Sequence, residues 1–443
     1  MKLLFMDEKG PQNSFRVSSP FDKYDKILYA DDKMTSYVAN VIQIDEDKYC
    51  SIEEKYRNIV SEYLLLRPQL GNSLNKNQKE LKGQHLLKSN FEFGIASMKQ
   101  NEIQFYINLL DVLFEYNVGN LTFLINKMSI ISTSRLNDFF YSLDLNNIEC
   151  SPFLVKYVIT KYLEIEASEE VIKSFLDKSI STKKLLKMIQ SDMKSIVSLN
   201  LENNRMKEQI QVYEIIIGII EEFFDANIKL NEPGIPLSFD WEKVRWAFDL
   251  WLTEQKLFKN GDDWKLFLDE GIPKSIFVEL NFNKIYENCD SKKCIGLQIT
   301  DMIVALIGKL VSKLSKATRY KFEEPDKRVL IPSKYFELTR EQFNLIKKLN
   351  LFIIGRNEKF HYINDAYFDS SVLLQSYFQY ISSYDSYENY KKIAKYTHKE
   401  LQMETFKYIS EDKWVEAIRD EYIARICYGS IKAAVENGIY RPL

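Results

Sequence analysis

GLQITDMIVALIGKLV, residues 296–311, predicts a long buried helix that carries a single carboxylate, Asp301. The residues one helical turn away from it are uncharged: Leu297, Gln298, Val304 and Ala305. An ionised carboxylate on a core-facing stripe costs several kcal/mol unless a charge or a metal ion compensates it. Asp301 is therefore a candidate site residue. The alternatives are that it points outward, or that it pairs with a basic residue from elsewhere in the fold.

Outward from this helix the sequence mixes strands with helices. Alternating or continuous apolar runs predict strands at 2–6, 36–45, 120–128 and 275–282. Apolar residues at helical spacing predict helices at 52–67, 101–117, 241–257 and 296–314. This mixture is typical of α/β and α+β folds, and we expect an α/β core around a mixed sheet.

Two regions depart from that pattern. Consecutive amphipathic helices fill about 133 to 230, with Ser168 and Ser181 as expected N-caps, and a tyrosine-rich, mostly helical region covers about 320–443. We therefore expect a core in two parts, 1–132 and 233–318, a helical insertion at 133–232 and a C-terminal region at 319–443. One apolar stripe of the C-terminal region should pack onto the rest of the protein or a second copy: Trp414, Ile418, Tyr422 and Ile426.

The composition is that of a globular protein. Of 443 residues, 45% are hydrophobic and 28% are charged, which excludes a long disordered chain. The totals of 60 Lys+Arg and 63 Asp+Glu give a net charge of -3, which disfavours a wholly basic nucleic-acid binder but not a local basic groove. With only 14 Gly and 10 Pro, the chain favours long helices over a turn-rich β-sandwich.

Cysteine usage and hydropathy predict a cytoplasmic protein with no membrane partner. The five cysteines are scattered without zinc spacing, which is typical of reduced thiols. No run of about 18 apolar residues is uninterrupted, and the N-terminal apolar run is too short for a signal peptide.

Several standard catalytic motifs are missing from the sequence. There is no G-x-S-x-G, no G-x-x-x-x-G-K-[ST] and no G-x-G-x-x-G, and the chain has only three histidines. These absences disfavour nucleophilic catalysis and nucleotide chemistry that depends on those loops.

Each of the other candidate acids, taken alone, is explained by an ordinary structural role. Asp7 and Glu8 end the first predicted strand and precede a turn, with their side chains expected on opposite sides. Glu80 lies in KELKG, which is typical of an exposed edge strand, and Asp290 fits an Asx turn. Asp240 fits an N-cap.

The order of these segments resembles the bacterial family called domain of unknown function 3800. The resemblance rests on MDE-x-G (6–10), ELKG (80–83), DSK (290–292) and GLQITD (296–301). It covers about 1–130 and 235–315. Lys9 stands where the family has a small residue, and Thr300 where it has alanine.

The resemblance implies a ribonuclease H-like fold, in which acids hold two divalent ions about 3.5–4 Å apart for phosphodiester cleavage. It maps Asp7 and Asp301 onto the metal ligands of the first strand and the late helix. Glu80 and Asp290 become additional ligands, Lys82 a phosphate contact and Gln298 an orienting residue, with Glu8 and Asp240 as weaker candidates. Oxygen ligands of this kind suit Mg²⁺ or Mn²⁺.

The sequence therefore predicts a metal-dependent nuclease that acts on DNA or RNA, with fold-level analogy to bacterial defence or toxin proteins. Its helical regions are expected to contact a protein partner or a second copy. The alternative is a non-catalytic binding or scaffold protein on the same core. A nuclease requires Asp7 to lie beside the start of the helix that bears Asp301, with basic residues nearby.

Overall fold

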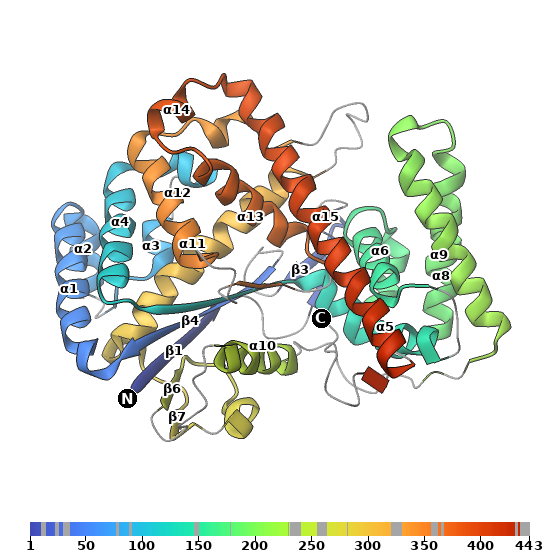
Figure 1. The fold of residues 1–443 in the computed structure, drawn as a ribbon, viewed down its shortest axis with the longest axis horizontal. Coiled ribbons are helices and arrows are strands. Elements are labelled where there is room, and N and C mark those ends of the chain that lie inside the picture. Colours follow the sequence, from blue (N-terminus) through green and yellow to red (C-terminus); the bar gives the residue numbers. More distant parts are fainter. Residues whose placement is uncertain are drawn as a thin grey trace.

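The computed structural model consists of a six-stranded sheet between helices, with a second group of helices beside it (Figure 1). It describes residues 1–9, 15–22, 26–29, 36–76, 79–87, 91–145, 150–177, 179–228, 230, 241–254, 264–280, 282–319, 330–355, 362–364, 367–429 and 433–434.

The first strand, β1 (Lys2–Lys9), lies in the middle of the sheet, whose order is β7-β6-β1-β4-β5-β8. It pairs antiparallel with β4 (Ser36–Asp45), and β4 pairs antiparallel with β5 (Gly119–Asn126). On its other side β1 pairs parallel with β6 (Trp264–Leu268), which pairs parallel with β7 (Lys284–Tyr286). The sheet is therefore mixed, as the sequence predicts. A separate small hairpin pairs β2 (Phe15–Val17) with β3 (Ile27–Tyr29).

Both faces of the sheet are covered, which explains why its central strands are apolar on both sides. Phe5 and Val38 face a core shared with α11 (Ile295–Ala317), whereas Met6 and Ala39 face α10 (Trp241–Glu254). In Figure 1 these two helices lie on opposite sides of the strands. The alternation along β1 thus determines which side chains can reach α11.

Helix α11 packs directly across β1 and β4. Within the described part of the chain it is the one helix long and apolar enough to cross a membrane, but 78% of its most apolar window is buried inside the protein. That burial is typical of the core helix of a soluble protein. Four further helices pack on the same side: α1 (Glu46–Leu65), α2 (Pro68–Lys76), α3 (Gly83–Leu86) and α4 (Gln100–Glu115).

The helical excursion begins at Lys127, directly after β5, and has its own hydrophobic core. It consists of α5 (Lys127–Leu145), α6 (Pro152–Ile165), α7 (Glu169–Leu176), α8 (Thr182–Leu199) and α9 (Lys207–Asp225). The two predicted caps are confirmed, because the side chains of Ser168 and Ser181 accept hydrogen bonds from Val171 N–H and Lys184 N–H.

The C-terminal region joins both cores. Its strand β8 (Tyr362–Asn364) pairs with β5 at the sheet edge. Its helix α13 (Asp369–Ser382) packs on α11, and α12 (Arg340–Ile353) packs on α13 and α4. The short α14 (Tyr387–Lys391) leads to the long α15 (Lys395–Tyr428). Figure 1 shows α15 running from this layer to the helical excursion.

Of the apolar stripe predicted on α15, Trp414 packs onto the rest of the protein, and packing of the other three residues onto a second copy stays a prediction. Trp414 packs against Phe153 of α6, but the other three predicted residues are exposed: Ile418 at 55%, Tyr422 at 62% and Ile426 at 64%. The buried face instead carries Ile409 and Ala417. A stripe chosen by the spacing of large apolar residues does not reveal a buried face that carries alanines such as Ala417.

The strand predicted at 275–282 is also wrong. Residues 274–280 form a short 3-10 helix, and the strands of this part of the sheet lie on either side of it, at β6 and β7. Phe277 of that turn is fully buried in the core beneath α10. A short β-branched and aromatic run favours both structures equally, and only the pairing of β6 with β1 decides between them.

Candidate active site

Two aspartates lie side by side where the parallel pairing of β1 with β6 ends. Met6 of β1 is in register with Leu268 of β6, so Asp7 and Asp269 follow as neighbours. The Asp269 N–H continues the pairing by donating to the Met6 carbonyl at 3.1 Å. Both side chains share the α11 face of the sheet with Phe5 and Phe267, whose rings stack 4.9 Å apart.

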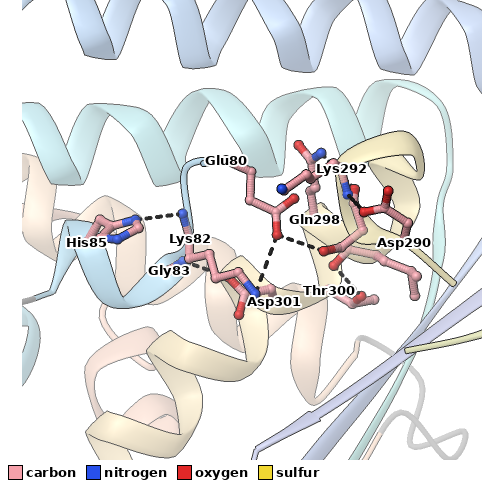
Figure 2. Close-up of polar contacts among 11 residues, drawn as sticks. Glu80, Lys82, Gly83, His85, Asp290, Lys292, Gln298, Thr300 and Asp301 are labelled. Carbon is pink, nitrogen blue, oxygen red and sulfur yellow. Dashed lines mark hydrogen bonds and ion pairs between the residues drawn. The ribbon is translucent and has the colours of Figure 1, made fainter. Parts of the chain in front are cut away.

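Asp301 lies on the second turn of α11, the helix that packs over Asp7 and Asp269 on this face of the sheet. Its Oδ2 accepts a hydrogen bond of 2.7 Å from the backbone N–H of Gly83 (Figure 2). A Cβ at position 83 would lie 2.5 Å from the Cβ of Ala305, so only glycine permits this approach. The glycine of ELKG therefore holds the carboxylate of GLQITD.

The three carboxylates repel one another. Burial raises the pKa of Asp7 well above its usual value, and the negative charges of Asp269 and Asp301 raise it further. Burial also raises the pKa of Asp269 and the charge of Asp301 adds to this rise, although a side-chain hydrogen bond with Asp7 and the positive charge of Lys82 act in the opposite direction. The expected proximity of Asp7 to Asp301 is thus confirmed, while a catalytic role for them stays a prediction.

Glu80 and Lys82 lie beside Asp301. Glu80 Oε1 accepts a 2.7 Å hydrogen bond from the Ser291 hydroxyl and lies 3.4 Å from Lys82 Nζ (Figure 2). Its other oxygen, Oε2, is buried and accepts no hydrogen bond from the described residues. Although burial alone lowers the pKa of Lys82, Glu80 and Asp301 outweigh it and raise that pKa overall. Lys82 therefore places a positive charge beside the carboxylates.

Asp290 and Gln298 build the turn before α11. The Asp290 carboxylate is half-exposed and accepts a hydrogen bond from Lys292 N–H at 3.1 Å, which is the Asx-turn alternative of the sequence. In Figure 2 it points away from Asp301. Gln298 Nε2 donates to the Ser291 carbonyl at 2.8 Å and so fixes the same turn.

Glu8 lies on the other face of β1, as expected from strand alternation. There its charge adds to burial in raising the pKa of Tyr37, on the side of the sheet that α10 covers. Asp240 lies outside the described residues.

Asp269 is the residue that sequence reasoning missed. Its strand, WKLFL (264–268), is short, and the strand assigned instead at 275–282 left Asp269 in a connection. A signal was present, because this run of apolar residues ends at Asp269-Glu270-Gly271, the same pattern of strand followed by acids that marks Asp7.

The donor set suits a divalent cation. Among the described residues no three His, Cys, Asp or Glu side chains converge tightly enough to form a ready-made metal site. Yet the raised pKa of Asp7 shows that protein groups do not compensate its ionised form, and Glu80 Oε2 is a buried acceptor without a hydrogen bond among the described residues. Mg²⁺ and Mn²⁺ are hard cations that prefer oxygen ligands such as these carboxylates.

A cavity of about 350 Å³ lies at the other end of α11, between Thr318, Lys161 of α6 and Phe406 of α15. Thr318 is on the order of 25 Å along the helix axis from Asp301. The cavity is therefore separate from the carboxylates, and an ion pair of 3.0 Å between Lys161 and Asp369 lies on its wall.

Comparison with known proteins gave no relative. No family model matches the chain, and no curated protein or solved structure is significantly similar to it. The function therefore has to be argued from the site.

The raised pKa of Asp7 predicts a pH dependence of stability in the absence of metal ions. Because its pKa is higher in the folded protein than the usual value of about 3.9, the folded state binds more protons between these two values. The stabilisation is complete below the unfolded-state pKa and is lost as pH rises through the folded-state pKa.

We expect the free energy of unfolding in chelator to fall more steeply for wild type than for Asp7→Asn as the pH rises above about 4. Urea denaturation measures both. Asp290→Asn, which changes an exposed turn residue, should retain the wild-type slope. Parallel pH profiles for wild type and Asp7→Asn would show that Asp7 titrates normally.

Proposed function

We propose that this protein is a metal-dependent nuclease on a ribonuclease H-like core. The observation that carries the proposal is the convergence of Asp7, Asp269 and Asp301 from two adjacent strands and the helix above them. The sheet supports it, because a mixed sheet with acids on its first strand and on a late helix is what the resemblance to domain of unknown function 3800 implies.

In this proposal Asp7, Asp269 and Asp301 hold Mg²⁺ or Mn²⁺, and Glu80 offers its free oxygen to an ion or a bound water. When bound, the ions supply the charge stabilisation that phosphodiester cleavage needs. Lys82 contributes a positive charge to the substrate phosphate. Gln298 acts indirectly, by fixing the turn whose Ser291 holds Glu80.

The direct test is cleavage of single- and double-stranded DNA and RNA by the full chain with Mg²⁺, with Mn²⁺ and with chelator. We expect cleavage only with an ion, together with a rise in melting temperature on adding it. A wild type that neither cleaves any of these substrates nor gains stability from either ion would leave the alternative of a non-catalytic binding protein.

Asp301→Asn separates a metal ligand from a structural aspartate without knowledge of the substrate. Asparagine retains an acceptor oxygen for the Gly83 N–H and removes one of the repelling charges. In chelator the variant should therefore be as stable as wild type or slightly more stable. It should lose the rise in melting temperature that Mn²⁺ gives the wild type.

The opposite outcome has a distinct signature. If Asp301 served to pair with Lys82, its replacement would destabilise the protein in chelator and Mn²⁺ would have no effect on either protein. Asp290→Asn is the matched control, since it alters the same kind of side chain in the turn before α11 and should keep the metal response.

A further inference from the structure

Lysines follow the carboxylates along both elements that carry them. Lys9 is two residues beyond Asp7 on the same face of β1, about 7 Å farther along the strand. On α11, Lys309 lies about 12 Å beyond Asp301. In both β1 and α11, therefore, an acid of the cluster is followed along the element by a lysine.

These lysines lie close to one another. Burial lowers the pKa of Lys309, and the charges of Lys313 and Lys9 lower it further, which places all three within electrostatic reach. Lys313 is one helical turn after Lys309. The Lys309 ammonium donates to the Leu87 carbonyl beside α3. Each of the three is partly exposed, and none forms an ion pair with a carboxylate in the part of the chain that the structure describes.

We propose that Lys9, Lys309 and Lys313 bind the backbone phosphates next to the one that is cleaved, so that the nucleic-acid strand runs beside α11 from Asp301 toward Lys313. This rests on the proposed nuclease function. A phosphate placed among the lysines would relieve their mutual repulsion, since it supplies the negative charge that the protein does not.

The carboxylates next to these lysines indicate which kind of polyanion binds here, an acidic peptide or a nucleic acid. An acidic peptide has carboxylates along its whole length and gains nothing from the Asp7–Asp269–Asp301 cluster. A phosphodiester strand suits both halves of the surface, because metal ions held by the acids attract one phosphate and the lysines attract the next. The substrate class is therefore a nucleic-acid backbone recognised without regard to sequence.

The test measures binding apart from cleavage. Asp269→Asn protein is titrated against fluorescein-labelled 20-mers of oligo(dT) and oligo(U) with Mg²⁺ at several salt concentrations, and anisotropy gives the affinity. Lys309→Gln keeps an N–H donor for Leu87 while removing the charge, and Lys9→Gln and Lys313→Gln complete the set. Each change should lower the slope of log affinity against log salt by about 0.7, and the triple variant by about 2.

Lys207→Gln is the matched control, because Lys207 is an exposed lysine at the start of α9 in the helical excursion. It should bind as its parent does. Melting curves verify that each variant folds, and Lys313→Gln, whose ammonium forms no hydrogen bond or ion pair among the described residues, tests the idea if Lys309→Gln does not fold.

The outcomes separate this inference from the nuclease proposal. If wild type cleaves but the triple variant binds with unchanged affinity and salt slope, then Lys9, Lys309 and Lys313 do not bind the backbone phosphates. The nuclease proposal is then unaffected. If polyglutamate displaces the oligonucleotides at equal concentration of charge, the assigned substrate class is wrong. If wild type neither cleaves nor binds, both proposals fall.

Discussion

Asp269→Asn should lower the rate of metal-dependent cleavage by about 10³-fold or more, because losing a metal ligand removes several kcal/mol of transition-state stabilisation. Asp269 is in register beside Asp7 and its negative charge acts on that carboxyl, so an ion between them depends on both. The measurement is single-turnover cleavage at saturating Mn²⁺.

Glu270→Gln is a closely matched control. Glu270 is the next residue in the chain and is exposed, so it lies outside the carboxylate cluster and its replacement should change the rate less than about twofold. Equal losses in both variants would mean that the negative charge of the connection, and not a defined ligand, supports cleavage. A fully active Asp269→Asn would remove Asp269 from the site.

Gly296→Ala should destabilise the folded protein by about 3 kcal/mol, near the upper end for overpacking a core. A Cβ at position 296 would lie 2.2 Å from the ring of Phe5, so α11 has to move away from β1 or the ring has to turn. Since β1 bears Asp7 and α11 bears Asp301, metal-dependent activity should fall as well.

Another helical glycine provides the control for this prediction. A Cβ at Gly218 of α9 would meet no atom within 4 Å, so Gly218→Ala should stabilise the protein by about 0.5–1 kcal/mol through helix propensity. Chemical denaturation compares the two. Adding Phe5→Leu to Gly296→Ala should recover part of the loss, and a Gly296→Ala protein as stable as wild type would contradict this account of the contact.

The parts of the fold that could be predicted are those with long local patterns. β4 lies at the residues predicted, 36–45, and the GLQITD segment starts a long buried helix. Asp7 and Asp301 could be paired because each stands out against apolar neighbours. β6 could not be predicted in the same way, because a strand of five residues shows too little periodicity and its partner β1 is far away in sequence.

The contacts that define the site could not be read from residue types alone. Gly83 and Gly296 are two small residues in two short segments, and only the structure shows that one donates to Asp301 and the other accommodates Phe5. Asp290 illustrates the reverse, since its motif suggested a ligand and its surroundings make it the cap of a turn. The buried face of α15 carries alanines such as Ala417, which a search for large apolar residues at helical spacing passes over.

The position of β6 also has a consequence for how the protein is made. On the ribosome β5 is complete at Asn126, whereas β6 begins at Trp264, so synthesis of the intervening residues takes roughly 7 to 28 s. During that interval one edge of β1 has no strand to pair with and presents its backbone to other nascent chains. The helical excursion thus delays completion of the sheet during translation. Because the unpaired edge of β1 is exposed in that interval, we expect aggregation of nascent chains when chaperones are scarce.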